Sequence, residues 1–215
     1  MDFWRQLDIL KPSELNISIS IIGAGGIGGP TALVLAKMGC RQVTVFDNDT
    51  IESHNLPNQF YRLADVGKFK VEALKEIIGL FTGVKIDARK ERFSLDGGLT
   101  DVIISGVDTM ASRKEIWEAI KWKTAVRLYI DGRMGGEVAR IFSARPHDPD
   151  DVNFYEKTLY SDDDSEDLAC TAQAIIYNVF AMASFIANQV KRVVKNEDLD
   201  KEIVLDFKTI TLIKR

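Results

Sequence analysis

The chain has 215 residues, of which 46% are hydrophobic and 28% are charged, a composition typical of a globular protein with a sizeable core. The formal net charge of −4 gives no indication of nucleic-acid binding, and the first residues lack a basic segment ahead of an apolar core, so no secretory signal is expected. Two cysteines are too few for a disulfide framework or a cysteine-rich zinc site, so we expect a cytoplasmic protein without zinc.

Strand-like and helix-like segments alternate through the first half of the chain, which favours a parallel sheet with crossover helices. Apolar runs predict strands at 17–22, 42–46, 84–88, 101–105 and 127–131. Helices are predicted at 29–40 and 70–81. In the second of these helices, Val71, Leu74 and Ile78 recur at helical spacing and form one apolar face.

The second half of the chain has a different character. Residues 136–144 predict an antiparallel strand, and 202–215 predict one or two further strands. Between them, 145–169 is polar and acidic and is predicted to be a long loop, and 170–194 is predicted to be a long apolar helix. Polar residues such as Asn178 interrupt this helix, so we expect it in the core or at a subunit interface, and not in a membrane.

Together these segments predict an α/β fold. It is a Rossmann-like mixed sheet with a parallel N-terminal half and antiparallel C-terminal strands. We expect one domain over residues 1–215, with the acidic loop at 145–169 inside it, and a dimer that forms through the long helix.

A glycine-rich stretch separates the first predicted strand from the first predicted helix. Gly23, Gly25 and Gly28 have the spacing GxGxxG, which lets the backbone approach a phosphate at a helix N-terminus. Asp47 ends the next strand, where a carboxylate can accept hydrogen bonds from ribose hydroxyls. The combination predicts an adenine-nucleotide site and leaves open whether the nucleotide is ATP or the NAD(P) of a Rossmann oxidoreductase.

Several more motifs follow in a fixed order. They are R-Q at 5–6, D-N-D at 47–49, N-L-P-N-Q at 55–59, V-G-K-F-K at 66–70 and an Asp108–Arg113 pair. In these motifs the sequence resembles the ThiF/MoeB family, the adenylating domain shared with ubiquitin-activating enzymes. An oxidoreductase would leave most of them unexplained. The resemblance implies a ThiF-like adenylation domain of the short, zinc-free type, in which 145–169 is a crossover-type loop.

The resemblance implies an ATP-dependent adenylyltransferase. The C-terminal carboxylate of a small ubiquitin-like or sulfur-carrier protein that ends in glycine would attack the α-phosphorus of ATP, and pyrophosphate would leave. ATP and Mg²⁺ are the implied cofactors, and the working unit is a homodimer. A peptide amide or a tRNA base is an alternative acceptor, although the acidic composition argues against tRNA.

Roles for individual residues also follow from the resemblance. Asp47 would hold the ribose, Lys70 would stabilise the α-phosphate and the leaving pyrophosphate, and Asp108 would bind Mg²⁺. Arg5 would reach across the dimer to the partner subunit's ATP. The remaining nucleotide-binding residues are Gly23, Gly25, Gly26, Gly28, Asp49, Asn55, Asn58 and Gln59.

Some of these residues have simpler interpretations. Asp108 is also a candidate N-cap of the helix that follows it, and Lys70 is a candidate solvated lysine at a helix start. Asn55 and Gln59 could simply satisfy a turn. Asn58 stands where the family has an arginine that meets the terminal phosphates. Arg62 and Arg113 are candidates to replace that charge. Otherwise the chain binds ATP poorly, or it is a non-catalytic partner subunit of an active homologue.

Cys170 is predicted to open the long helix, and a helix N-terminus lowers the pKa of a thiol. The resemblance implies a thioester between this thiol and the activated carrier. The alternative is a small buried residue at the start of a helix. Cys40 is expected to be structural.

Overall fold

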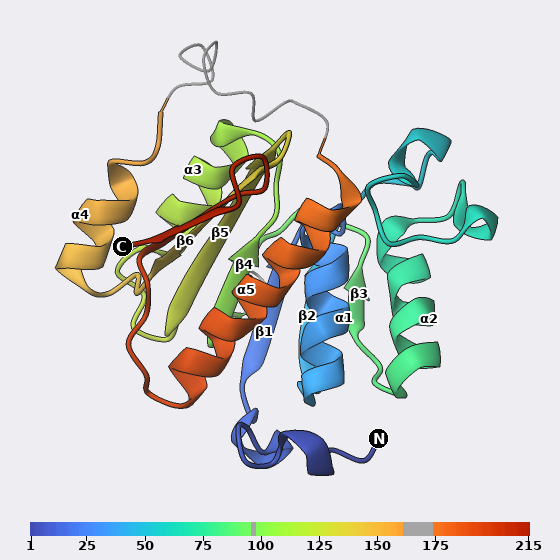
Figure 1. Cartoon of the computed structure of the whole chain (residues 1–215), viewed down its shortest axis with the longest axis horizontal. Coiled ribbons are helices and arrows are strands. Elements are labelled where there is room, and N and C mark those ends of the chain that lie inside the picture. The colour runs from blue at the N-terminus through green and yellow to red at the C-terminus, as the bar shows by residue number, and fades with distance from the viewer. Residues whose placement is uncertain (96–97, 161–173) are drawn as a thin grey trace.

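A mixed sheet of eight strands forms the centre of the computed structural model, which describes residues 1–95, 98–160 and 174–215 (Figure 1). The order of the strands is β3-β2-β1-β4-β5-β6-β7-β8. Their bounds are Ser18–Ile22 (β1), Gln42–Phe46 (β2), Asp87–Arg89 (β3), Val102–Ser105 (β4), Leu128–Gly135 (β5), Val138–Ala144 (β6), Glu202–Asp206 (β7) and Thr211–Lys214 (β8).

The sheet is parallel from β3 to β5 and antiparallel from β5 to β8. In the parallel part, Ile21 of β1 lies opposite Val45 of β2 on one side and Ile104 of β4 on the other. The strand order reverses between β1 and β4, and ligands of such sheets bind beyond the carboxyl ends of the strands at the reversal. The predicted Rossmann-like mixed sheet is confirmed.

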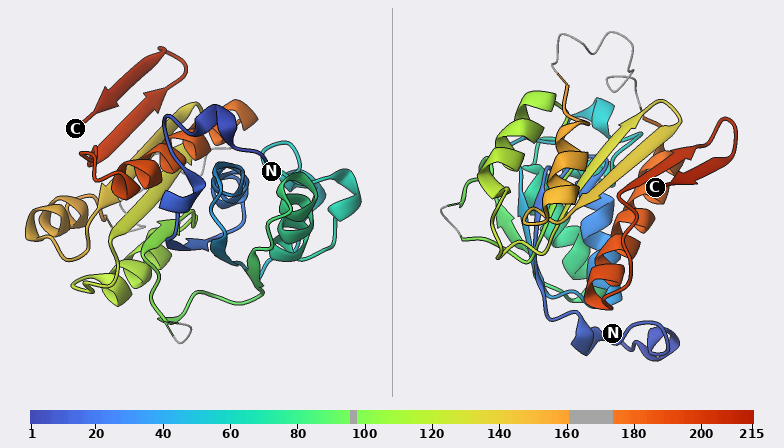
Figure 2. Two further views of the ribbon diagram at one scale, coloured as in Figure 1. Left: turned by 90° about the horizontal axis from the view of Figure 1, so that it is seen from below. Right: turned by 90° about the vertical axis from the view of Figure 1, so that its left-hand side faces the viewer.

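Helices cover both faces of the sheet (Figure 2). The α-helices are Gly28–Met38 (α1), Lys70–Thr82 (α2), Met110–Ile120 (α3), Pro149–Glu156 (α4) and Ile176–Val194 (α5). Short 3-10 helices span Trp4–Gln6 (η1), Pro12–Glu14 (η2), Ser53–Asn55 (η3) and Leu63–Asp65 (η4). Helices α1, α2 and α5 lie on one face, and α3 and α4 lie on the other.

The core has two layers because successive strand residues point to opposite faces. Ile21 and Ile104 pack in the layer under α1 and α5. Ile22 packs in the second layer, where Trp117 of α3 and Tyr155 of α4 lie with ring centroids 4.6 Å apart. Burial on both faces fixes the ends of the strands, from which the loops of the site project.

The structure departs from the predicted elements in two strands. Strand β3 begins later than the predicted strand at 84–88, and β5 runs on to Gly135 beyond the predicted end at 131. The extension is explained by pairing: β5 and β6 form a hairpin whose turn includes Gly136, with a φ of +58°. The two predicted strands at 127–131 and 136–144 are therefore the two arms of one hairpin, and the first arm is longer than predicted.

The stretch 145–169, predicted to be a loop, contains α4, and its residues from 161 onward lie outside the described residues. Asp148 caps α4, since its side chain accepts from the N–H groups of Asp150 and Asp151. Helix α5 begins at Ile176, so the prediction that Cys170 opens it is wrong; Cys170 itself lies outside the described residues.

Helix α5 packs in the core against α1 and the β5–β6 hairpin. The core was one of the two positions predicted for it, and a subunit interface was the other. In the described part of the chain, no helix is long and apolar enough to cross a bilayer. The expected dimer through α5 stays a prediction.

Candidate active site

A glycine-rich turn joins β1 to α1 at the carboxyl edge of the sheet. Gly23 has a backbone φ of +93°, which side chains disfavour, and its N–H donates to the carbonyl of Phe46 at 2.8 Å. A Cβ atom on Gly28 would lie 1.8 Å from the carbonyl oxygen of Gly23, so position 28 admits no side chain. These two glycines fix the turn that the sequence spacing predicts.

Asp47 follows β2 and holds the turn in place. Its Oδ2 atom accepts from the N–H of Ala24 at 2.7 Å, and its Oδ1 atom accepts from the N–H of Asp49 at 2.8 Å. The Tyr61 hydroxyl donates to the carbonyl of Ala24 at 2.5 Å, and burial, aided by the nearby Asp47 charge, raises the pKa of this hydroxyl. Because carboxylate oxygens accept more than one hydrogen bond, Asp47 can also receive a ribose hydroxyl.

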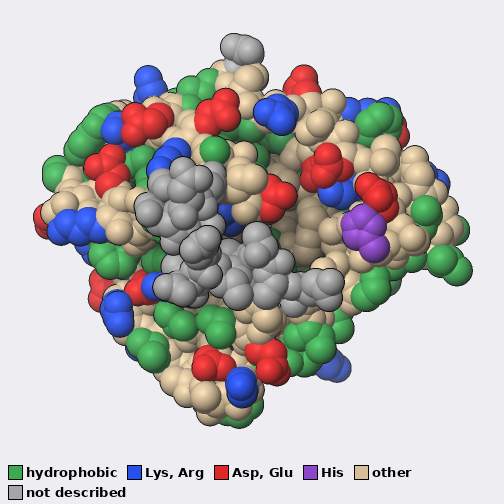
Figure 3. All heavy atoms as spheres, turned by 90° about the horizontal axis from the view of Figure 1, so that it is seen from above, with side chains coloured by type: hydrophobic (Ala, Val, Ile, Leu, Met, Phe, Trp, Pro, Cys, Tyr) green, Lys and Arg blue, Asp and Glu red, His purple; other side chains and the backbone are tan. Residues whose placement is uncertain are grey.

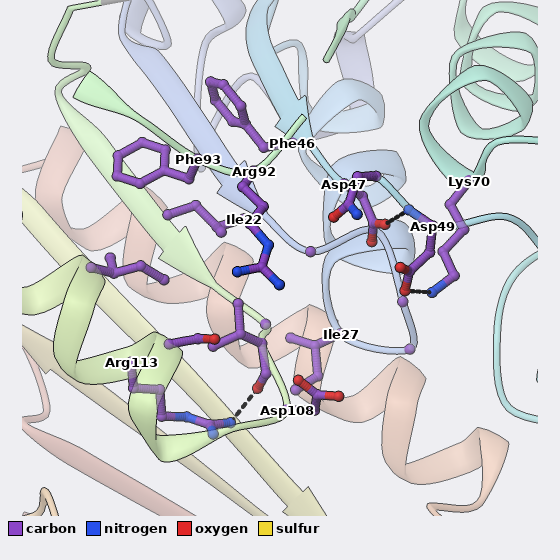
Figure 4. Close-up of a pocket in the computed structure, with 18 of the residues that line it drawn as sticks. Ile22, Ile27, Phe46, Asp47, Asp49, Lys70, Arg92, Phe93, Asp108 and Arg113 are labelled. Atoms are coloured by element: carbon purple, nitrogen blue, oxygen red, sulfur yellow. Dashed lines mark hydrogen bonds and ion pairs between the residues drawn. The ribbon is translucent and has the colours of Figure 1, made fainter. Parts of the chain in front are cut away.

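The glycine turn borders a cavity of about 970 Å³ at the carboxyl ends of β1, β2 and β4. Figure 3 looks down on this end of the molecule, where acidic side chains border a hollow. One side of the cavity is apolar: Ile22, Phe46 and Phe93 line it, and the two phenylalanine rings meet edge to face with centroids 5.4 Å apart (Figure 4). The volume and the mixed walls suit a ligand the size of a nucleotide.

Lys70 begins α2 on the other side of the cavity (Figure 4). Its Nζ atom lies 2.7 Å from Asp49 Oδ2, and its backbone N–H donates to the carbonyl of Asp49 at 3.0 Å. The Lys70 side chain is only 10% exposed, so it is not the solvated lysine of the simpler interpretation. The structure therefore places an ammonium group at the edge of the cavity, held there by one carboxylate.

Asn58 and Gln59 line the cavity beside the glycine turn. The main-chain oxygen of Asn58 lies 3.1 Å from the position of a Cβ atom built on Gly26, so a side chain at position 26 would crowd it. Among the described residues, Asn58 Oδ1 and Gln59 Oε1 are buried and have no hydrogen-bond partner. Because buried polar atoms are nearly always paired, this wall has the chemistry of one that a ligand or water completes.

Asp108 lies in the loop after β4 and lines the same cavity. The N-cap of α3 is Thr109, whose Oγ1 accepts from the N–H of Ser112 at 3.2 Å, so Asp108 does not cap this helix. The described residues hold no cluster of three or more metal-ligating side chains. An exposed Asp108 nevertheless fits Mg²⁺, since this ion takes one or two carboxylates and completes its shell with substrate phosphates.

A buried charge network lies beneath Asp108. Asp131 of β5 is fully buried and accepts from Arg113 Nε at 3.0 Å and from Arg133 Nε at 2.7 Å. Arg113 also donates to the carbonyl of the residue before Asp108, and Arg133 donates to the carbonyl of Thr158 at 2.8 Å. The two arginines share one carboxylate, and their bonds to it and to the carbonyl groups offset part of the cost of burying these charges. The network ties the Asp108 loop and the end of α4 to one strand.

Neither arginine proposed to compensate for Asn58 is available in the cavity. Arg113 lines it, but its guanidinium is held by the buried network described above. Arg62 lies outside the cavity-lining residues and pairs with Asp65 at 2.7 Å and with Glu76 at 2.9 Å. The predicted replacement of the family arginine by either residue therefore gains no support from these contacts and stays a prediction.

Two other predicted site residues also lie away from the cavity. Asn55 does not line it, because its Oδ1 accepts from the N–H of Glu52 at 2.9 Å within the turn of η3. Arg5 lies in η1, at the end of the molecule opposite the cavity (Figure 1), where the neighbouring Gln6 donates to the carbonyl of Met38 at 2.8 Å. A contact of Arg5 with a nucleotide would thus need a second copy of the chain.

Arg92 is a cavity residue that the sequence reasoning missed. It follows β3 by three positions, and Figure 4 shows its guanidinium pointing into the cavity between Asp47 and Asp108. A signal was available in the sheet topology: Asp47 and Asp108 follow strands of the parallel sheet, and Arg92 follows a third strand of that sheet.

Comparisons with known proteins agree with this arrangement. A model of the ThiF family matches residues 13–214. The probable adenylyltransferase/sulfurtransferase MoeZ of Mycobacterium tuberculosis is 30% identical over 105 residues, which are 46% of this chain and 27% of that protein. The NEDD8-activating enzyme E1 catalytic subunit of Arabidopsis thaliana is 37% identical over 109 residues, which are 46% of this chain and 23% of that protein.

Solved structures show the same fold. E. coli MccB with ATP superimposes with a TM-score of 0.72 at 18% identity, and MccB with AMPCPP and MccA superimposes with the same score at 20% identity. Each superposition covers 95% of this chain and 65% of the MccB chain. The chain therefore spans about a quarter of the curated relatives it matches and just under two thirds of MccB.

Proposed function

The chain belongs to the ThiF family, and from this premise we propose that it is an ATP-dependent adenylyltransferase. One observation carries the proposal: the glycine turn, Asp47, Lys70 and Asp108 come from four separate segments and surround one cavity at the carboxyl edge of the sheet. An oxidoreductase would use the turn and Asp47 but would leave Lys70 and Asp108 without a role.

The proposed reaction is the transfer of AMP to a carboxylate. A carboxylate oxygen of the acceptor attacks the α-phosphorus, the bond between that phosphorus and the α–β bridging oxygen breaks, and pyrophosphate leaves with the bond electrons. The product is an acyl-adenylate. Positioning and charge neutralisation carry most of the catalysis in such a transfer, and these are what this cavity offers.

In the proposed complex, one residue holds the ribose of the nucleotide and the others hold or neutralise its phosphates. Asp47 holds the ribose, and the backbone N–H groups of Gly25 and Gly26 face the phosphates at the N-terminus of α1. Lys70 exchanges its contact with Asp49 for the α-phosphate and the leaving pyrophosphate. Asp108 would hold Mg²⁺, which would supply neutralising charge to the phosphate oxygens.

The proposed acceptor is the C-terminal glycine of a small ubiquitin-like or sulfur-carrier protein. The names of the relatives support this class, since they include a NEDD8-activating enzyme and an adenylyltransferase/sulfurtransferase. A peptide is the other acceptor that a solved neighbour suggests, because MccB is described with MccA. A thioester on Cys170 and a homodimer remain part of the proposal.

Thermal unfolding with added nucleotide tests the proposal. ATP with Mg²⁺ should raise the midpoint of unfolding, because a ligand that binds only the folded state stabilises it. NAD(H) and NADP(H) should not. The shift should shrink in Asp108→Ala and stay intact in Asp150→Ala, a matched loss of an exposed carboxylate outside the cavity.

Two results would contradict the proposal. A shift with nicotinamide nucleotides alone would assign the glycine turn to redox chemistry. No shift with either class of nucleotide would assign the chain to the role of a non-catalytic partner, for which Asn58 in place of the family arginine is the main argument. In the positive case, pyrophosphate release with small carrier proteins that end in Gly-Gly would then identify the acceptor.

A further inference from the structure

Among the described residues, three long cationic side chains line the cavity, and two of them are already held by carboxylates. Lys70 lies 2.7 Å from Asp49, and Arg113 lies 3.0 Å from Asp131. Arg92 is exposed, and no ion pair or hydrogen bond joins its side chain to another described residue. Its guanidinium is therefore free to contact whatever enters the cavity.

The position of Arg92 identifies the part of the ligand that it meets. The polar side of the cavity, with the glycine turn, Asn58 and Lys70, is where phosphates would lie. Arg92 belongs to the other side, since the next residue is Phe93, whose ring packs on Phe46. An apolar wall is the place for a base, because the flat faces of a base gain most from leaving water.

We propose that Arg92 stacks its guanidinium on the adenine base of bound ATP, with the apolar wall behind the base. A guanidinium is planar and delocalised and stacks on aromatic faces, which a compact ammonium does not do as well. This inference rests on the proposed function, because it assumes that ATP is the ligand. It makes Arg92 a determinant of affinity for the base that acts independently of the phosphates.

Binding measurements on three variants test the inference. Dissociation constants of wild type, Arg92→Gln, Arg92→Tyr and Arg92→Lys would be measured by calorimetry for ATP with Mg²⁺ and by ligand-observed NMR for adenosine. Arg92→Gln should weaken both ligands by the same factor, roughly threefold to thirtyfold. Arg92→Tyr should stay within about threefold of wild type, since an aromatic ring also stacks on a base.

Lys90→Gln is the matched control. It removes a neighbouring cation that lies outside the cavity-lining residues and pairs with Glu72, so ATP binding should not change. Circular dichroism checks that each variant folds, as expected for an exposed side chain.

Distinct results would overturn the inference. If Arg92→Gln weakened ATP but not adenosine while Arg92→Lys bound ATP like wild type, Arg92 would be a phosphate contact. If Arg92→Gln bound both ligands like wild type, Arg92 would have no binding role. If the wild type bound no ATP, the proposed function itself would fail, and this outcome is separate from the other two.

Discussion

Asp47 and Asp108 show how much of this site is decided by single side chains. Asp47 uses both carboxylate oxygens to fix backbone N–H groups around the glycine turn. Asp108 is left exposed because Thr109 takes over the capping of α3. Without a ligand, the Asp47 carboxylate thus has a structural role, whereas the Asp108 carboxylate is accessible to a ligand.

Cys40 should be chemically unreactive in the folded protein. Cys40 is fully buried, and desolvation raises the pKa of its thiol to about 12. It should therefore remain a protonated, unreactive thiol between pH 7 and 9, because the thiolate is the nucleophile. Peptide mapping after iodoacetamide treatment of the native protein should find no label on Cys40.

This result would leave Cys170 as the remaining cysteine for any adduct with an activated carrier. Intact mass of wild type and Cys170→Ser after incubation with ATP and a carrier would then report directly on a thioester. Label on Cys40 in the native protein would contradict the prediction.

At the scale of elements, hydrophobic patterning predicted most of the fold. Strand β2 has the predicted bounds, and α1 and α2 lie within two residues of theirs, because apolar runs between polar turns left little choice. The sequence analysis did not predict helix α4, although Asp148 followed by Pro149 is a typical helix N-terminus. The acidic composition of 145–169 outweighed that local signal.

The site was predicted less completely than the fold. Gly23 and Asp47 were predicted from the glycine spacing and the strand order, and Asp108 from the family resemblance; all three follow strand ends and line one cavity. Asn55 does not line the cavity in this structure, because its side chain bonds the backbone of its own turn, the simpler of its two interpretations. The pairing of Arg113 of α3 with a buried aspartate of β5 could not be predicted from the spacing of residues along the chain.

Two glycine-to-alanine substitutions in the turn should differ greatly in their effect on stability. Gly28→Ala would force a Cβ atom to 1.8 Å from a carbonyl oxygen, so it should cost more than about 3 kcal/mol of stability or prevent folding. Gly25→Ala meets its nearest atom, Gln59 Nε2, at 3.8 Å and should change stability by less than about 1 kcal/mol. Urea denaturation measures both, and Gly25→Ala should still weaken ATP binding.

The segment between η3 and α2 should give the protein an acid-sensitive contribution to stability. Asp65 is fully buried and accepts from Arg62 and Lys68, and these contacts lower the pKa of its carboxyl. A lowered pKa gives stability that is present above the ordinary aspartate pKa of about 4 and is lost as the pH falls through the folded value.

Asp65→Asn should therefore lower the free energy of unfolding by roughly 1–3 kcal/mol at pH 7, and the difference from wild type should shrink below about pH 4. Urea denaturation at pH 7 and pH 3 measures this. The exposed Asp8→Asn is a control that should change little at either pH. An Asp65→Asn effect of equal size at both pH values would show that charge is not its cause.

At the scale of the whole molecule, the position of Arg5 makes the dimer testable. Arg5 lies at the end of the chain opposite its own cavity, so any role at a nucleotide must come from a second copy. Arg5→Ala and Asp108→Ala should each be inactive alone. When the two variants are mixed and their subunits exchange, about a quarter of wild-type activity should return. Half of the dimers then contain one subunit of each variant, and one of the two sites in such a dimer is intact.

Pyrophosphate release with an acceptor present reports this recovery. Recovery would support both the dimer and the action of Arg5 across it. Full activity of Arg5→Ala on its own would remove Arg5 from the reaction, and light scattering would still decide the oligomeric state separately.

The buried network around Asp131 has a consequence for the history of this sequence. Arg113 and Arg133 depend on the same carboxylate, so losing Asp131 would leave two buried guanidinium groups without a counter-charge, whereas losing one arginine leaves a balanced pair. Replacement of Asp131 alone should therefore be purged, and lineages should change it only together with the arginines. In a set of close relatives, positions 113, 131 and 133 should co-vary, and a chain that has lost Asp131 should have lost both arginines as well.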